Sequence, residues 1–193
     1  MERKDYDEAK VAAVASHIEE IIRLIGEDPA REGLVKTPVR AAKALLYATS
    51  GYRLDPTALM SQAIFSYNGS QMVIVKDIEF YSLCEHHILP FFGTMSIGYV
   101  PDGTMLGLSK VARVVDAYAR RLQVQEHLTA QVCREIFDTL PAKGVIVSCT
   151  AQHLCMKMRG VEKQDSATTT TDYLGVFAAD PALRAEFFHA LNS

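Results

Sequence analysis

The spacing of apolar residues divides the chain into a helical beginning and a mixed remainder. Over residues 7–25 the apolar side chains recur every three or four positions, which is the period of an amphipathic helix. Gly26 and Pro29 then end this segment. The pair Thr37-Pro38 is typical of a helix start and predicts a second helix, capped by Thr37, that runs toward Gly51.

After a loop through Asp55-Pro56, the pattern changes between strands and helices. The predicted elements are, in order, strands at 72–80, 94–100 and 105–107, helices at 109–122 and 124–140, strands at 145–158 and 166–171, and a helix from Pro181 to about Leu191. Turn residues at 101–103 join the second and third strands as a hairpin, and Ser109 caps the first of the two paired helices. Strands followed by two consecutive helices favour an α+β fold with an antiparallel sheet.

Two segments concentrate the residue types that bind metals. The run SLCEHH at 82–87 contains Cys84 and His87, and the segment HLC at 153–155 adds Cys155. A Cys-x-x-His pair on one turn brings a thiolate and an imidazole within reach of one ion, and a distant Cys supplies a third ligand. Because three protein ligands leave a fourth position open, this pattern indicates a catalytic zinc site.

Other interpretations of the same residues stay open at this point. Cys84 and His87 alone can be half of a structural site or two core residues, and Cys84 can also pair with Cys155 in a disulfide. Side chains alternate along a strand, so His153 and Cys155 are expected on one face of the strand at 145–158. The remaining cysteines, Cys133 and Cys149, are expected to pack in the core.

Composition excludes several classes of protein. With 193 residues, of which 49% are hydrophobic, the chain can bury a core, and its net charge of −3 gives no general attraction to nucleic acid or membrane. The sequence contains four Cys and neither a secretory signal nor an apolar run of membrane-spanning length. We therefore expect a cytoplasmic protein with reduced thiols.

Four segments together resemble type I GTP cyclohydrolase I. They are SLCEHH at 82–87, GLSKVARVVDAYARRLQVQE at 107–126, HLCMKMRG at 153–160 and SATTTT at 166–171. The resemblance implies the tunnelling fold, with two consecutive helices on one face of an antiparallel sheet, preceded by N-terminal helices. It further implies a ring-shaped homo-oligomer, a decamer in this family. With the helical pattern of the first fifty residues, this divides the chain into a helical region at 1–52 and a tunnelling-fold catalytic domain at 53–193. The implied reaction converts GTP and water to formate and 7,8-dihydroneopterin triphosphate.

The resemblance also assigns roles to individual residues. It implies zinc ligands at Cys84, His87 and Cys155, protonation of the five-membered ring by His86, and proton transfer by His153. Histidine suits these tasks because it both donates and accepts protons near neutral pH.

Recognition of GTP needs a carboxylate and a group of cations. By resemblance Glu126 binds guanine, since a carboxylate can accept hydrogen bonds from the ring imino group and the exocyclic amine together. Without the resemblance, Glu126 reads as an acidic residue in the first turn of a helix. The other substrate-binding residues implied are Ser109, Lys110, Arg113, Gln125, Arg159 and Arg40, of which Arg40 is expected to reach a neighbouring subunit's site.

Two rival functions differ from this one in the residues that they need. A tunnelling-fold relative acting on another pterin or a deazaguanine would share the architecture but should lack the combined Cys and His set. A zinc-stabilised scaffold would not need His86, His153 and Glu126.

Overall fold

The structure is a computed structural model that describes residues 6–192. The chain forms two compact units, one up to Ser50 and one from Gly51 onward. A short 3-10 helix, Ser50–Arg53, lies where one unit passes into the other. None of the helices within residues 6–192 has the length and apolar character needed to cross a membrane.

The first unit is a pair of helices, α1 (Glu8–Leu24) and α2 (Thr37–Ala48). Both predicted helices are confirmed. The Asp7 carboxylate caps α1 by accepting hydrogen bonds from the backbone N–H groups of Ala9 and Lys10. The predicted cap of α2 is wrong by one residue, because Lys36 holds that position and Thr37 is already helical. The two helices bury a small cluster formed by Val11, Ala15 and Ala42.

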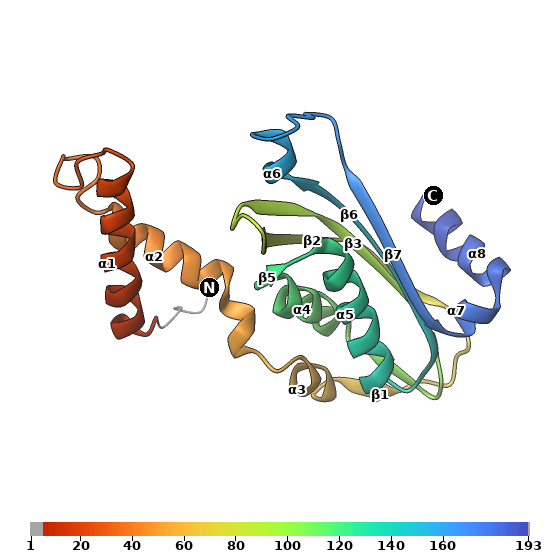
Figure 1. Ribbon diagram of the computed structural model, residues 1–193. Coiled ribbons are helices and arrows are strands. Elements are labelled where there is room, and N and C mark those ends of the chain that lie inside the picture. The colour runs from red at the N-terminus through yellow and green to blue at the C-terminus, as the bar shows by residue number, and fades with distance from the viewer. Residues whose placement is uncertain (1–5, 193) are drawn as a thin grey trace. The chain divides into compact units, whose positions relative to one another are not determined.

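The second unit is built on a five-stranded sheet with the order β5-β2-β3-β6-β7 (Figure 1). Its strands are β2 (Val73–Cys84), β3 (Pro90–Pro101), β5 (Leu122–Gln123), β6 (Ala142–His153) and β7 (Thr168–Gly175). Each pair of neighbours is antiparallel except β2 and β5, which are parallel. The predicted antiparallel sheet is therefore confirmed, although β2 and β3 extend further than their apolar patterns indicated.

Two helices, α4 (Leu108–Ala119) and α5 (Gln125–Thr139), cover one face of this sheet (Figure 1). Apolar residues recur along them at helical spacing, and their buried side chains face alternate residues of the strands. The main core cluster includes Val111, Val115, Leu128, Val132 and Ile136 from the helices, and Met95, Ile97, Val147 and Cys149 from the strands. Both Cys133 and Cys149 are buried in this core, as predicted.

The opposite face is covered by the C-terminal segment. Helices α7 (Val176–Ala179) and α8 (Pro181–Leu191) place Phe177 and Phe187 against Ile146 of β6. Gly98 is needed under this contact, because a Cβ atom there would lie 2.8 Å from the Phe187 ring. Helix α8 begins at Pro181 as predicted, and the carboxylate of Asp180 caps it by accepting hydrogen bonds from two backbone N–H groups.

Three local predictions are wrong. The short strand β4 (Thr104–Leu106) pairs with β1 (Ile64–Ser66) in a separate two-stranded sheet, so it does not complete a hairpin with β3. The predicted loop at Asp55-Pro56 is the start of α3 (Pro56–Ser61), with Asp55 as its cap. Helix α4 begins at Leu108 after Gly107, so Ser109 is not its cap.

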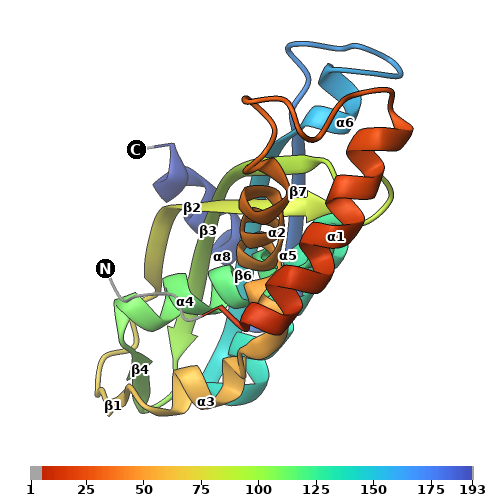
Figure 2. The ribbon, with the colours of Figure 1, turned by 90° about the vertical axis from the view of Figure 1, so that its left-hand side faces the viewer.

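A fourth correction concerns the strand that carries the candidate ligands. β6 ends at His153, and Cys155 lies on the one-turn helix α6 (Leu154–Lys157) that follows. His153 and Cys155 therefore do not share a strand face. In two views at right angles, α6 and the loop after it lie at one end of the second unit, and β1 and β4 lie at the other (Figures 1 and 2).

Leu128→Ala tests the core between α5 and the sheet. Leu128 is 0% exposed, so we expect the free energy of unfolding to fall by about 2–5 kcal/mol, through lost burial and the cavity left behind. Leu108→Ala is the matched control, because Leu108 is 63% exposed and its loss should change stability by less than about 0.5 kcal/mol. Chemical denaturation followed by circular dichroism measures both; equal effects would contradict the proposed core.

Candidate functional site

The candidate metal ligands converge at the end of β2. After Cys84 the chain turns back into β3, and the Cys84 carbonyl accepts hydrogen bonds from the N–H groups of His87 and Ile88. The Cys84 N–H in turn donates to the Leu89 carbonyl at 2.8 Å. Ile88 has a φ of 55°, a left-handed conformation that a β-branched residue rarely adopts. This tight turn brings His87 back beside Cys84.

Cys84, His87 and Cys155 form one group whose ligand atoms all lie within 4.8 Å of one another. The Cys84 Sγ is 3.8 Å from the His87 Nδ1. Tetrahedral zinc, with bonds of about 2.0–2.3 Å, would place its ligand atoms about 3.5–3.8 Å apart. Two thiols and an imidazole at these separations can hold a soft divalent ion with a modest inward shift. Cys84 and Cys155 are free thiols in the structure.

Without a metal ion, the surroundings of Cys155 favour its neutral thiol. Burial raises the pKa of its thiol, and the neighbouring Cys84 raises it further, while Arg159 acts in the opposite direction. A bound divalent cation would reverse this, because it stabilises both thiolates.

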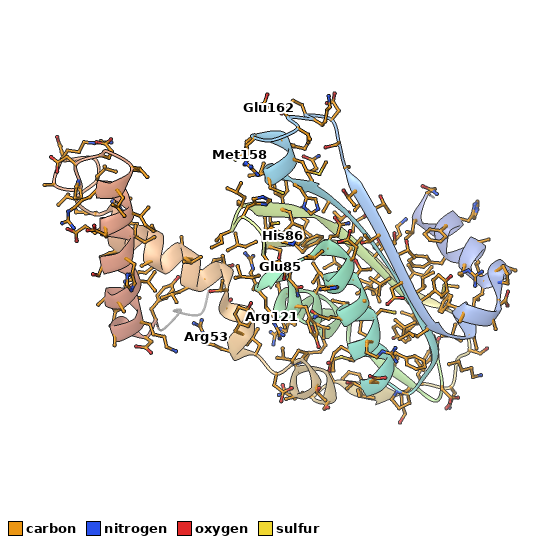
Figure 3. All side chains as sticks on the ribbon, viewed as in Figure 1. Arg53, Glu85, His86, Arg121, Met158 and Glu162 are labelled. Carbon is orange, nitrogen blue, oxygen red and sulfur yellow. The ribbon has the colours of Figure 1, made fainter. Side chains whose placement is uncertain are left out.

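The three candidate ligands line a pocket of about 220 Å³. Five parts of the fold meet there, namely the turn after β2, the end of β5, the start of α5, the junction of β6 with α6 and the start of β7. Its lining residues are Cys84, His86, His87, Gln123, Val124, Gln125, Glu126, His153, Cys155, Met156 and Thr168. Figure 3 shows Glu85 and His86 on the turn, with Met158, just beyond α6, above them.

The two other histidines have different surroundings. His153 is half-buried and stacks on Phe91, with ring centroids 4.7 Å apart and planes inclined by 2°. Its Nε2 lies 2.8 Å from the Gln125 Oε1. Burial lowers the pKa of His153, and Glu126 partly opposes this. His86, by contrast, is exposed, with its Nε2 3.8 Å from a Glu85 carboxylate oxygen.

Comparison with known proteins agrees with this geometry. The sequence pattern of the family described as GTP cyclohydrolase I matches residues 14–192. The chain belongs to the GTP cyclohydrolase I family. The expected tunnelling fold is thereby confirmed.

Curated relatives carry the family name across nearly the whole chain. "GTP cyclohydrolase 1" of Porphyromonas gingivalis is 52% identical over 185 residues, covering 96% of this chain and 95% of the relative. That of Bacteroides thetaiotaomicron is 52% identical over 192 residues, covering 100% and 97%. That of Deinococcus radiodurans is 54% identical over 173 residues, covering 90% and 80%.

A more distant likeness exists among solved structures. The apo crystal structure of the archaeosine synthase QueF-Like aligns with a TM-score of 0.45 at 17% identity, covering 56% of this chain and 97% of that chain. A similarity at this level does not affect the assignment to the GTP cyclohydrolase I family.

Several residues expected to bind substrate in this family lie outside the pocket of their own chain. Ser109, Lys110 and Arg113 are in the first turns of α4, and none of them is among the described residues that line the pocket. The far end of α4 leads into β5, which pairs with Cys84 beside the pocket. A 12-residue helix is about 18 Å long, so Ser109 and Lys110 lie roughly a helix length from that end and Arg113 about half a helix length.

The remaining predicted residues are also placed by their elements. Glu126 is exposed in the first turn of α5 and lines the pocket. Arg159 is exposed just beyond α6, close enough to Cys155 to affect the pKa of its thiol. Arg40 is exposed on α2, in the first unit.

The sequence patterns missed several side chains that surround the site. Phe91 stacks on His153 because the two residues are paired across β3 and β6, a relation that no local pattern reveals. Gln123 and Thr168 line the pocket from β5 and β7. β5 has two residues and is too short to produce an alternating pattern.

Proposed function

We propose that this chain opens the imidazole ring of GTP by hydrolysis, giving formate and 7,8-dihydroneopterin triphosphate. The reaction would take place at a zinc ion held by Cys84, His87 and Cys155. Family membership supports the GTP cyclohydrolase activity. The observation that carries the specific proposal is the convergence of two thiols and an imidazole in one pocket with His153 and Glu126. We further propose that residues 53–193 form the catalytic domain.

The donor set fits zinc and leaves room for a reacting water. Three protein ligands are the number found at catalytic zinc sites, where the metal supplies an acidified water for hydrolysis. The ligands differ in burial, with Cys84 buried, Cys155 half-buried and His87 exposed toward solvent. This gradient leaves the site accessible from the pocket. The free thiols that the site requires favour a cytoplasmic location.

The two histidines are proposed to move protons. His86, exposed at the pocket, is free to protonate the five-membered ring of guanine and to exchange its proton with solvent. His153, held against Phe91, carries protons during hydration of the ring and release of formate. Neither is needed as a zinc ligand.

Glu126 is proposed to select guanine. It is the carboxylate among the described residues that line the pocket, and it lies in the first turn of α5. Its negative charge acts to raise the pKa of His153. A carboxylate accepts two hydrogen bonds from the imino and amino groups of guanine, a donor pair that adenine lacks.

The triphosphate is proposed to bind cations from a neighbouring copy. Ser109, Lys110 and Arg113 do not line the pocket of their own chain, and a homo-oligomer, a decamer by resemblance, would bring them to an adjacent pocket. Arg159 would contribute from the pocket's own chain, and Arg40 from a neighbour.

Incubating the purified protein with GTP tests the reaction. We expect formate and a dihydroneopterin triphosphate, identified by mass spectrometry, and we expect a zinc chelator to abolish both. Zinc binding without formate release would favour the scaffold, and turnover of another pterin or a deazaguanine would favour the rival enzyme.

Zinc content tests the ligand set. Wild-type protein should contain about one zinc per chain, and Cys155→Ser should lose both zinc and activity because two ligands hold the ion weakly. Cys133→Ser, a cysteine buried on α5 away from the pocket, is the matched control and should keep its zinc. Elemental analysis measures both; a fully active protein free of metal would refute the zinc mechanism.

Glu126→Ala tests guanine recognition. Unpaired guanine donors cost about 1–3 kcal/mol for each group, so the affinity for GTP should fall by roughly one order of magnitude or more. Glu186 is an exposed acidic residue on α8. Glu186→Ala removes the same charge as Glu126→Ala and is the control, so it should bind GTP with wild-type affinity. Titration calorimetry gives both affinities, and unchanged binding by Glu126→Ala would remove this residue from the site.

Co-expression of inactive variants tests whether the site is shared between copies. Arg113→Ala damages the cation group of α4 and Cys155→Ser damages the zinc pocket, so mixed assemblies should regain activity where a neighbour supplies each missing part. Glu126→Ala with Cys155→Ser is the matched control, since both changes fall in one pocket and should not complement. Absence of recovery in the first pair, with mixing verified by mass spectrometry, would contradict a shared site.

A further inference from the structure

The side chain of Gln125 is held in a buried network between α5, β6 and β7. Gln125 is only 1% exposed. Its Nε2 lies 3.1 Å from the Cys149 carbonyl oxygen, 3.0 Å from the Thr168 carbonyl oxygen and 3.2 Å from the Thr170 Oγ1. Its Oε1 lies 2.8 Å from the His153 Nε2. Each polar atom of the carboxamide is thus already engaged by the protein.

The chemistry of these partners fixes which way the carboxamide points. Backbone carbonyl oxygens only accept hydrogen bonds, so the end of Gln125 that faces Cys149 and Thr168 must be the NH₂ group. The other end, facing His153, is therefore the carbonyl oxygen. Rotating the carboxamide by half a turn would set oxygen against oxygen at both backbone contacts.

Two threonine hydroxyls reinforce this orientation. The Thr129 Oγ1 donates to the Gln125 backbone carbonyl at 2.9 Å. The Thr170 Oγ1 lies 2.6 Å from the Thr129 Oγ1, and either hydroxyl can be the donor in this contact. Toward the Gln125 NH₂ group, which only donates, Thr170 can offer only a lone pair.

The orientation of Gln125 determines the state of His153. The Gln125 Oε1 carries no hydrogen, so the bond at 2.8 Å requires a proton on the His153 Nε2. In the neutral ring the lone pair is then on Nδ1. The stacking on Phe91 fixes the plane of the same ring.

We propose that Gln125 is a positioning residue that acts through His153, holding its imidazole in one orientation with the proton on Nε2, and that its side chain does not contact GTP. This inference rests on the proposed function of His153 as a proton carrier, and it replaces the substrate-binding role that resemblance gives to the side chain of Gln125.

Spectroscopy tests the positioning without any turnover. In zinc-loaded protein labelled with ¹⁵N on the histidine rings, the His153 signals are identified by their loss in His153→Ala. We expect the wild-type signals to show a proton held on Nε2, and a mixture of ring protonation patterns in Gln125→Met. The same His153 signals in both proteins would overturn the inference.

Kinetics tests the consequence for the reaction. Gln125→Met should lower kcat for formate release by roughly 10–100-fold while KM for GTP changes by less than about threefold. His153→Ala should lower kcat by roughly 10²–10⁴-fold and keep its zinc, and adding Gln125→Met to it should change kcat by less than about twofold. A rise in KM, or an equal loss of kcat in the His153→Ala background, would show that Gln125 does not act through His153.

Two further variants separate positioning from a structural role. Gln125→Glu keeps an oxygen for the His153 Nε2 but sets an oxygen against the Cys149 and Thr168 carbonyls, so it should be less stable yet more active than Gln125→Met. If activity follows stability across these variants, the role is structural and the inference fails. Gln123→Met is the matched control, since Gln123 is 4% exposed in the same pocket and donates to Tyr118 and Gln131; its effect should persist undiminished in the His153→Ala background.

The outcomes also separate this inference from the proposed function. Lack of formate release by wild-type protein refutes the function, while the ring spectra still decide whether Gln125 positions His153.

Discussion

The antiparallel ladders that join β2, β3 and β6 are the constraint on which the site depends. β3 pairs with β2 as far as Leu83↔Pro90 and with β6 as far as Phe91↔His153. The carboxyl ends of β2 and β6 therefore lie at the same end of the sheet, on either side of β3. The turn after β2 and the helix after β6 consequently begin side by side, although they are far apart in the sequence. A slip of one residue in the ladder between β3 and β6 would turn His153 to the other face, and a slip in either ladder would separate the two thiols.

Burial of polar groups near this edge requires a complete set of partners. A half-satisfied network in a low-dielectric interior costs more than an apolar core, whereas a complete one fixes a unique arrangement. Within residues 6–192, every buried side-chain nitrogen and oxygen has a hydrogen-bond partner. Gln125 meets this requirement with bonds to two neighbouring strands, which ties the start of α5 to β6 and β7. The same bonds that stabilise the packing therefore also define the surroundings of His153.

Sequence patterns predicted the parts of this structure that depend on local periodicity. The amphipathic helices and the main strands are of this kind, and the ligand group of Cys84, His87 and Cys155 followed from spacing. The position of Cys155 was wrong because β6 ends at His153, and no residue in that segment marks the change to a helix. The partner of β4 was wrong because β1 has three residues and an adjacent hairpin is the simpler pairing. The contacts of Gln125 and Phe91 arise from pairing between distant segments, which a linear pattern does not contain.

The position of α4 explains why one pocket does not contain all the residues expected to bind GTP. The carboxylate of Glu126 lines the pocket, where its negative charge attracts a metal cation or an amino group and repels a triphosphate. The cation Lys110 lies in the first turn of α4 and Arg113 in the second, and the buried face of the helix prevents it from turning them toward the pocket. A rigid helix about 18 Å long thus keeps opposite charges apart within one chain. On the proposed function, phosphate and guanine recognition would meet where the start of one α4 approaches the pocket of another copy, and assembly would then be part of the binding site.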